Sequence, residues 1–325
     1  MPVDRTTQRF AARTHHHGDF DPSELQRVKR ERDLTVSVVI PARNEAPTVG
    51  EVAGTLRRAL QVDIDLVDEL LVVDADSEDG TGEVARAAGA RVVRQSDVLP
   101  AAGSALGKGE ALWKGLAATD GDLVVFIDAD IKDIGARFVV GLLGPLLLDD
   151  EVRFSKATYD RPLQVGSELQ PSGGGRVTEL LARPLIAAFW PELGWLAQPL
   201  SGEYAGDRAL LEGLPFVRGY GVELAMLVDI VEQHGAHTIA QVDLGRRVHD
   251  HQSLDALGRM AAEILHVTVD RLSRQGRLVL TDPLAATLLQ PFRDAAGQLD
   301  MGRHEVRPEE RPALADWRRL EGTSA

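Results

Sequence analysis

The sequence predicts an α/β protein whose core is a mostly parallel β-sheet flanked by helices. Three short segments, 35–42, 68–76 and 123–130, are rich in β-branched and other apolar residues. Runs of consecutive apolar residues are typical of strands buried on both faces of a parallel sheet. The segments between them show helical spacing, and strands alternating with helices indicate parallel strands joined by right-handed crossovers.

The first half of the chain follows this alternation closely. Residues 1–34 are polar and charged, and we expect an arm with one short helix around 22–32. Strands and helices then alternate along the chain, as in a nucleotide-binding α/β region. Strands are expected at 35–42, 68–76, 90–94 and 123–130, and helices at 45–60, 81–88 and 108–118.

The second half is expected to be more helical. An edge strand is predicted at 152–159 and another strand at 238–248, with helices at 177–189, 222–233 and 254–273. These patterns divide the chain into an arm (1–34), an α/β region (35–150), a more helical region (151–280) and a tail (281–325). Because the last twenty residues are highly charged, we expect them to be loosely ordered or to form an oligomer contact.

Composition restricts the classes of function. The net charge of −14 argues against a general nucleic-acid-binding protein, and any anionic substrate must meet a local cluster of Arg and Lys. The chain has no cysteine, which excludes disulfides and thiolate metal sites and suits a reducing cytoplasm. The longest lightly charged stretch, 184–202, contains three prolines, so no membrane span is expected.

Two carboxylates follow the most apolar predicted strand. Asp128 and Asp130 come directly after the run 123–127. Ligands of open α/β sheets bind beyond the carboxyl ends of such strands. Two neighbouring carboxylates are costly there unless they share a cation, so the pair indicates a divalent metal site that holds a diphosphate. The alternative is a loop in which these residues cap a turn or a helix.

Three further candidates lie at neighbouring strand or helix ends. Asn44 and Glu45 follow the first strand and suit a nucleoside, or else form a capping turn. Asp74 ends the second strand and suits ribose or base hydrogen bonds, or else a turn rich in Asp, Ser and Gly. Lys108 begins a helix between two glycines, where phosphate binds well, the alternative being a flexible capping loop.

The second half contains a Gly-rich loop at 172–176. Three glycines expose successive N–H groups, which form an anion nest in suitable conformations. Arg176 adds a forked donor that matches carboxylate or phosphate, and Thr178 adds a hydroxyl in the first helical turn. The alternative is a flexible hinge before the helix.

Two other polar sites follow later in the chain. Glu223 comes after the Gly-rich loop 218–221 and suits a sugar hydroxyl, or else it is an acidic first-turn residue favoured by the helix dipole. His249 and His251 follow the late strand beside Arg247, and a His can complete a metal site built from Asp residues. The alternative is a pair of exposed surface histidines.

Taken together, these motifs resemble the actinobacterial glucosyl-3-phosphoglycerate synthases and their mannosyl-3-phosphoglycerate synthase relatives. The resemblance covers about residues 35–270, with the motifs in order and at family-like spacing. The motifs are VVIPARNEA, VVDADSEDGT, GKGEALW, FIDAD, SGGGRVTELLARPL, QPLSGEYAGDR, GYGVE and RRVHDH. Single strings such as Asp-x-Asp are weak signals, whereas the ordered set is specific.

The resemblance implies the GT-A glycosyltransferase fold, with a Rossmann-like sheet and a more helical acceptor-binding half. It implies a retaining transferase that moves glucose from a nucleoside-diphosphate-glucose to 3-phosphoglycerate, with Mg²⁺ or Mn²⁺ as cofactor. A cytoplasmic homodimer without nucleic-acid or membrane partners is expected. The alternatives are mannosyl transfer from GDP-mannose, a GT-A transferase with another acceptor, and a nucleotide-sugar-binding protein without turnover.

The resemblance also implies a role for each matched site residue. The catalytic residues it implies are Asp128, Asp130, Glu223 and Arg176. The donor-binding residues it implies are Pro41, Ala42, Asn44, Glu45, Ala75, Lys108, Asp128, Ala129, Leu200, Tyr220, Glu223 and Arg247. The acceptor-binding residues it implies are Gly175, Arg176, Thr178 and His251, and the metal ligands are Asp130 and His249.

The chain departs from the family pattern at two places. The family more often has Asp-Ser-Gly-Ser where this chain has Asp-Ala-Asp-Ser at 74–77, at the second strand end. It often has Asn where this chain has His251. The first departure concerns the choice of base, and the second concerns the acceptor contact. Uridine versus guanosine and glucose versus mannose therefore stay open at this point.

Overall fold

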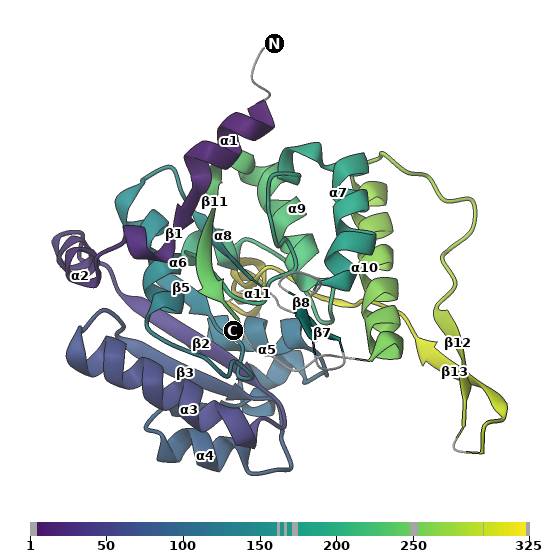
Figure 1. The fold of residues 1–325 in the computed structure, drawn as a ribbon, viewed down its shortest axis with the longest axis horizontal. Coiled ribbons are helices and arrows are strands. Elements are labelled where there is room, and N and C mark those ends of the chain that lie inside the picture. The colour runs from purple at the N-terminus through teal and green to yellow at the C-terminus, as the bar shows by residue number, and fades with distance from the viewer. Residues whose placement is uncertain are drawn as a thin grey trace.

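The computed structural model describes residues 5–160, 163–165, 168–170, 175–247, 253–294 and 296–322. Its centre is an eight-stranded sheet in the order β1-β11-β6-β9-β5-β2-β3-β4 (Figure 1). Only β9 runs antiparallel to its neighbours in this sheet, β5 and β6, and the other pairings are parallel. The predicted α/β fold class with a mostly parallel sheet is confirmed.

The first-half strands form where the apolar runs predict them. They are β2 (Val36–Ala42), β3 (Glu69–Asp74), β4 (Arg91–Arg94) and β5 (Leu123–Phe126). Successive side chains point to opposite faces of the sheet. Val38 therefore packs on one face with the helices α3 (Ala46–Arg57) and α6 (Arg137–Leu148), and Val39 packs on the other face with α5 (Lys108–Ala117).

Helix α6 was not predicted from the sequence, although it lies in the core. Its residues 138–147 are all buried, and it carries Pro145 in its interior. A helix that is apolar on every side has no amphipathic period, so it gives little helical signal. The remaining short elements of this half are α4 (Thr81–Ala87), η2 (Arg58–Asp63), η3 (Gln95–Asp97) and η4 (Pro100–Ala102).

The second half extends the same sheet and covers it with helices. Its sheet strands are β6 (Phe154–Asp160), β9 (Tyr204–Asp207) and β11 (Ile239–Arg246). The predicted edge strand 152–159 is wrong in one respect, because β6 lies between β11 and β9 inside the sheet. The helices are η5 (Thr178–Ala182), α7 (Arg183–Phe189), η6 (Pro191–Leu193), α8 (Arg208–Glu212), α9 (Val222–His234), η7 (Ala236–Thr238) and α10 (Leu254–Arg274). A small hairpin joins β7 (Leu163–Val165) and β8 (Glu168–Gln170).

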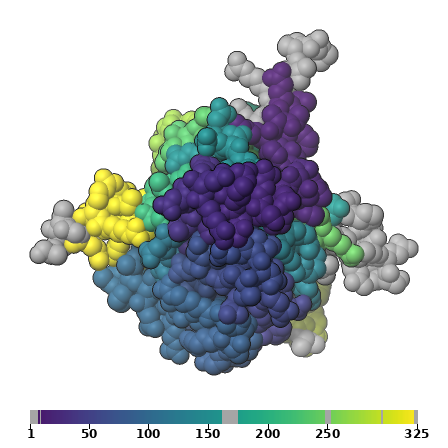
Figure 2. Space-filling model, turned by 90° about the vertical axis from the view of Figure 1, so that its left-hand side faces the viewer, coloured from purple at the N-terminus to yellow at the C-terminus, as the bar shows by residue number. Residues whose placement is uncertain are grey.

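The N-terminal residues form more structure than the predicted single helix. That helix is α2 (Pro22–Glu31), and the Asp21 side chain accepts hydrogen bonds from the N–H groups of Ser23 and Glu24. Before it lie α1 (Arg5–Arg13), β1 (Thr14–His16) and η1 (His17–Asp19), and β1 pairs with β11 at the edge of the main sheet. Figure 2 shows this purple segment lying across the blue first half of the chain.

The tail contains a projecting hairpin and a docked end. The hairpin of β12 (Thr287–Arg293) and β13 (Leu299–Glu305) extends away from the rest of the molecule (Figure 1). Strand β14 (Glu310–Arg311) then pairs with β10 (Phe216–Val217), and α11 (Leu314–Gly322) follows. The expected loose ordering is wrong for 306–322, since Val306, Arg311 and Leu314 are buried. None of the helices among the described residues has the length and apolar character of a membrane span.

Candidate active site

A cleft with a volume of about 670 Å³ opens at the carboxyl ends of β2 and β5. This is the edge at which ligands bind in open α/β sheets. Fifteen residues that the sequence singled out line it. They are Pro41, Ala42, Glu45, Ala75, Lys108, Asp128, Ala129, Asp130, Gly175, Arg176, Thr178, Leu200, Tyr220, Glu223 and Arg247.

Four candidates stand apart from these fifteen, namely Asn44, Asp74, His249 and His251. Asn44 is not among the residues that line the cleft, and His249 and His251 lie outside the described residues. Asn44 has φ 56°, and its Oδ1 accepts a hydrogen bond of 3.1 Å from Glu78 N. Its contacts therefore match the turn interpretation, although the N-cap of α3 is Glu45 rather than Asn44.

The second strand end also forms a turn. Asp74 is buried, and its Oδ1 accepts a hydrogen bond of 3.0 Å from Ser77 N. This contact matches the turn interpretation of Asp74. The neighbouring Ala75 is the residue of this strand end that lines the cleft. The loop therefore presents its backbone and a small side chain to a ligand rather than the carboxylate of Asp74.

Lys108 is held at the start of α5 by a close approach between two backbone segments. Gly109 N donates a hydrogen bond of 2.8 Å to Arg218 O. A Cβ on Gly107 would overlap the carbonyl oxygen of Arg218, and one on Gly109 would overlap that of Val217. Gly107 also has φ 128°, which side-chain-bearing residues rarely adopt. The two glycines therefore allow the helix to begin against this loop.

The floor of the cleft is a charged cluster formed by Lys108, Asp128, Asp130, Glu223 and Arg247. Lys108 Nζ lies 2.6 Å from Asp128 Oδ1 and 3.2 Å from Glu223 Oε1. Arg247 Nη2 lies 3.1 Å from the other carboxylate oxygen of Asp128. Burial alone would raise the pKa of Asp128, but the charges of Lys108 and Arg247 hold that pKa well below its usual value. Asp128 is therefore ionised in the cleft.

Two buried charged residues behind the floor of the cleft were missed by sequence reasoning, and neither of them lines it. Glu203 is fully buried and accepts a hydrogen bond of 2.7 Å from Tyr159 OH, and its Oε1 lies 3.1 Å from Arg247 Nη2. Lys156 is also buried, and its Nζ donates a hydrogen bond of 2.6 Å to Ser201 O. Burial raises the pKa of Glu203 and lowers that of Lys156 to about 7.

Glu203 and Lys156 differ in how far the sequence around them could have indicated a role. Glu203 lies within the motif QPLSGEYAGDR, but it stands in a strand-entry segment where an acid has no assigned function. Lys156 lies in the middle of β6 and has no motif around it. Only the packing of β6 against β9, which pairs Lys156 with Tyr204, brings Lys156 close behind the cleft.

The wall above the cluster is formed by the starts of α9 and α10. Glu223 lies in the first turn of α9, and Tyr220 stands just before it with its side chain 43% exposed. Tyr220 N donates a hydrogen bond of 2.7 Å to Glu263 Oε2 on α10. Sequence reasoning missed Glu263, which lines the cleft and whose pKa is raised by burial. Its only signal was a place in an amphipathic helix.

The acceptor candidates lie at and just before the start of η5, which contacts α10. Gly175 has φ 83°, Thr178 begins η5, and Arg176 lies between them on the cleft wall. Residues 172–174 of the Gly-rich loop lie outside the described residues, so two of the three glycines of the predicted nest do too. A second hollow of about 240 Å³ shares Gly175 and Thr178 with the cleft and extends to Gln198.

The acidic pair suits a divalent cation. Asp128 Oδ2 and Asp130 Oδ1 lie 3.1 and 3.0 Å from the same atom, Arg247 Nη2, so the two carboxylates converge on one cationic point. Carboxylate oxygens are the ligands that Mg²⁺ and Mn²⁺ prefer. Among the described residues no group of three or more His, Cys, Asp or Glu is placed to hold a metal. His249, which is predicted with Asp130 as a metal ligand, lies outside them.

Comparison with known proteins gives a family match over the first half. The family described as "Glycosyl transferase family 2" matches residues 37–132, which include β2, β3, α5 and the acidic pair. Curated relatives match far more of the chain. The glucosyl-3-phosphoglycerate synthase of Petrotoga mobilis is 48% identical over 273 residues, covering 84% of each chain. That of Mycobacterium tuberculosis is 47% identical over 261 residues, covering 79% of each.

Solved structures match nearly the whole fold. The mannosyl-3-phosphoglycerate synthase of Rubrobacter xylanophilus has a TM-score of 0.88 at 40% identity and covers 98% of this chain and 99% of its own. The glucosyl-3-phosphoglycerate synthase of Mycobacterium tuberculosis in complex with Mn²⁺, UDP and phosphoglyceric acid has a TM-score of 0.82 at 40% identity. That match covers 94% of this chain and 98% of the other.

Proposed function

Because this chain belongs to the glucosyl-3-phosphoglycerate synthase family of glycosyltransferases, we propose that its cleft transfers glucose from a nucleoside-diphosphate-glucose to 3-phosphoglycerate. The family resemblance of the motifs and the GT-A fold are thereby confirmed. The observation that carries the proposal is the convergence of fifteen motif residues on one cleft at the carboxyl edge of the sheet. The Mycobacterium tuberculosis relative has been solved with UDP-glucose and phosphoglyceric acid, which supports the same pair of substrates here.

The donor side of the cleft suits a diphosphate. Lys108 and Arg247 supply two cations, and both pair with Asp128, so they are held in place before a ligand binds. A divalent ion bound at Asp130 and Asp128 would neutralise the departing diphosphate as a Lewis acid. Mn²⁺ or Mg²⁺ is present in complexes of the Mycobacterium tuberculosis relative, which supports these metals.

We propose transfer with retention at the anomeric carbon. Glu223 is engaged with Lys108 at 3.2 Å, so it is better placed to orient a glucose hydroxyl than to attack the sugar. In the proposed step the bond from C1 to the diphosphate oxygen breaks, and the acceptor oxygen bonds to C1 on the same face. The acceptor proton passes to the departing phosphate oxygen, which removes the need for a protein base.

The acceptor side suits a small molecule that carries a carboxylate and a phosphate. Arg176 and Thr178 both line the cleft. A guanidinium matches carboxylate or phosphate with two parallel hydrogen bonds. In a chain with a net charge of −14, this local cation is needed to attract 3-phosphoglycerate.

One observation favours a second donor. The mannosyl-3-phosphoglycerate synthase of Rubrobacter xylanophilus matches this fold with a TM-score of 0.88. The same cleft would then use GDP-mannose, with the metal and acceptor residues unchanged. The base and the sugar of the donor are each recognised by few hydrogen bonds. An activity assay with each donor is therefore needed to distinguish the two functions.

The test is product formation from 3-phosphoglycerate and Mg²⁺ with UDP-glucose, GDP-glucose or GDP-mannose. We expect the glucose donors to dominate, and dominance of GDP-mannose would make the mannosyl activity the function. Asp130→Ala should abolish turnover by weakening metal and diphosphate binding together, whereas Arg176→Ala should mainly raise the acceptor KM. Absence of turnover with every donor would contradict the proposed acceptor.

We also propose that the protein is a cytoplasmic homodimer. Its proposed substrates are phosphorylated anions that membranes retain. The β12–β13 hairpin exposes Leu289, Phe292, Leu299 and Met301, a set of apolar side chains suited to a second copy. Light scattering after size exclusion should give twice the chain mass of 35.2 kDa, and Phe292→Asp with Met301→Asp should halve it. A monomeric wild-type protein would contradict this proposal.

A further inference from the structure

The end of the tail packs against the start of α5 and the 218–221 loop, which carry Lys108 and Tyr220 of the cleft. Strand β14 pairs with β10 in antiparallel register, with Arg311 opposite Phe216. Arg218 N, just beyond β10, donates a hydrogen bond of 2.9 Å to Glu309 O. The same Arg218 offers its carbonyl oxygen to Gly109 N at the start of α5. The tail, the 218–221 loop and α5 therefore form one continuous set of backbone contacts.

Arg311 connects this strand to the first turn of α5. Its Nε and Nη2 each lie 2.6 Å from a carboxylate oxygen of Glu110, two residues after Lys108. Its Nη1 donates to Ala102 O at 2.6 Å, and its Nη2 also donates to Gly103 O at 3.3 Å. The side chains are 7% and 0% exposed, so the ion pair is buried and shielded from solvent screening.

The 98–107 loop depends on such contacts for its position. Leu99, Gly103 and Gly107 have positive φ values, and no strand pairing includes the loop. Lys114 Nζ, on α5, donates to the carbonyl oxygens of Leu99 at 3.0 Å and Gly103 at 2.8 Å, and also to that of Val98. Two buried cations, Lys114 and Arg311, therefore hold the loop by its carbonyl groups.

The loop leads directly into the cleft. Leu106, Gly107 and Lys108 all line it, and Lys108 Nζ must lie between Asp128 and Glu223 to keep both ion pairs. Buried, bidentate pairs hold their partners in one geometry, whereas a single donor allows rotation. Movement of Glu110 or of residues 102–103 would therefore displace Lys108 relative to the carboxylates.

We propose that Arg311, in the C-terminal tail, is a positioning residue of the donor site. It holds the N-terminal end of α5 and the 98–107 loop, and it acts through Lys108 rather than on the substrate. The kinetic test of this inference rests on the proposed function. It assigns a role to a tail segment 201 residues away in sequence from the helix that it holds.

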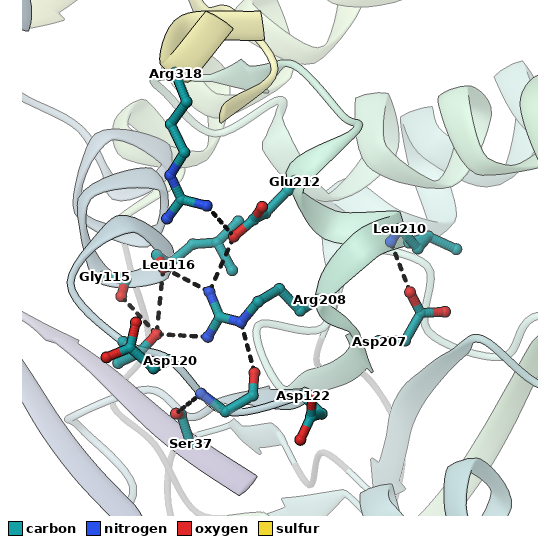
Figure 3. Close-up of polar contacts among 12 residues, drawn as sticks. Ser37, Gly115, Leu116, Asp120, Asp122, Asp207, Arg208, Leu210, Glu212 and Arg318 are labelled. Carbon is teal, nitrogen blue, oxygen red and sulfur yellow. Dashed lines mark hydrogen bonds and ion pairs between the residues drawn. The ribbon is translucent and has the colours of Figure 1, made fainter. Parts of the chain in front are cut away.

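Arg208 provides a matched control at the other end of α5. Its Nε donates to Gly121 O at 2.6 Å, and its Nη1 donates to Leu116 O at 3.0 Å (Figure 3). Its Nη1 also lies 3.1 Å from Glu212 Oε1. Arg208 thus combines one carboxylate with backbone carbonyls, as Arg311 does, but neither Arg208 nor its partners line the cleft.

The experiment compares Arg311→Lys with Arg208→Lys in the full-length enzyme. Lysine keeps the charge and loses the bidentate geometry. We expect Arg311→Lys to lower kcat/KM for the nucleotide-sugar roughly 10- to 100-fold, because small displacements of a positioned group have effects of this size. The acceptor KM should stay unchanged. Arg208→Lys should lower the unfolding temperature by a similar amount and leave the kinetic constants within about twofold of the wild type.

Hydrogen exchange separates this inference from the proposed function. Amides of 98–108 should exchange faster in Arg311→Lys than in Arg208→Lys, whichever reaction the wild type catalyses. If Arg311→Lys does not fold, Glu110→Gln should show the same pattern more weakly. Equal exchange in the two variants, or donor kinetics altered equally in both, would overturn the inference. If the wild type shows no turnover but amides of 98–108 still exchange faster in Arg311→Lys, only the proposed function is contradicted.

Discussion

The two ends of α5 are each held by an arginine from a distant part of the chain, but they serve different purposes. At the N-terminal end Arg311 holds Glu110 and the 98–107 loop, next to the cleft. At the C-terminal end Arg208 holds the turn after the helix, at the opposite edge of the sheet. The chemistry of the two is alike, so what each arginine contributes depends on what lies beside the segment that it holds.

The two ends also differ in how completely their polar groups are used. At the C-terminal end Gly121 N donates to Ser37 Oγ at 2.9 Å, and Thr119 Oγ1 donates to Gly115 O at 3.0 Å, so the turn is closed by internal partners (Figure 3). At the N-terminal end Lys108 faces a cleft where Asp130 is 44% exposed. Helix α5 precedes the parallel strand β5, so its start lies at the carboxyl edge, where ligands bind.

The largest effect is expected from Lys108→Met, at the cleft end. The change removes a cation from the proposed diphosphate site and leaves Asp128 and Glu223 without their shared partner. We expect kcat/KM to fall at least roughly 100-fold, as for loss of a preorganised charge, with the acceptor KM little changed. Steady-state kinetics with both substrates varied measures this. A loss of less than about threefold would remove Lys108 from the diphosphate site.

A glycine pair on the same helix gives a sharper comparison. Gly109→Ala would overlap Val217 O at the cleft end, and Gly115→Ala would overlap the side chain of Val39 in the core. Both should lower the free energy of unfolding by about 1–3 kcal/mol, the usual effect of overpacking.

Only Gly109→Ala should also change the kinetics of the folded enzyme, because only it displaces Lys108. We expect its kcat/KM to fall roughly 100-fold, whereas that of Gly115→Ala stays within about twofold of the wild type. Denaturant unfolding and kinetics on the same preparations measure both properties. Equal kinetic losses in the two variants would mean that the ends of α5 do not differ as described.

The smallest effect is expected at the outer layer of the C-terminal end. Arg318 on α11 is 49% exposed and lies 2.8 Å from Glu212 Oε1 (Figure 3). Exposed ion pairs contribute at most about 1 kcal/mol, so Arg318→Ala should change the free energy of unfolding by less than that and leave turnover unchanged. A larger loss would show that α11 depends on this pair, and not on the buried Leu314, for its docking.

Local pattern predicted the first half of the fold well. The strands β2, β3 and β5 are runs of mostly apolar residues, which appear because both faces of these strands are buried. Prediction failed where burial removes the pattern or where an element is very short. Helix α6 is apolar on all sides, while β1 and β14 comprise three and two residues. Such short strands have no periodicity to detect.

The candidate site shows the same division. The acidic pair, Lys108 and Glu223 follow directly from strand and helix ends, where elementary topology concentrates ligand-binding groups. Glu203, Lys156 and Glu263 lie on other elements, and nothing beside them in the chain indicates a cleft. Their place depends on how β6, β9 and α10 pack around it.

By itself the sequence determined the fold class, the family resemblance and most of the cleft, because periodicity and strand-end chemistry are local properties of the chain. Tertiary structure alone decided which buried charges stand behind the cleft and where the end of the tail docks. Glu110 and Arg311 are 201 residues apart, and neither has a neighbour that indicates the other. A buried ion pair depends on the mutual position of two distant segments, which only the packing of the complete sheet and its helices establishes.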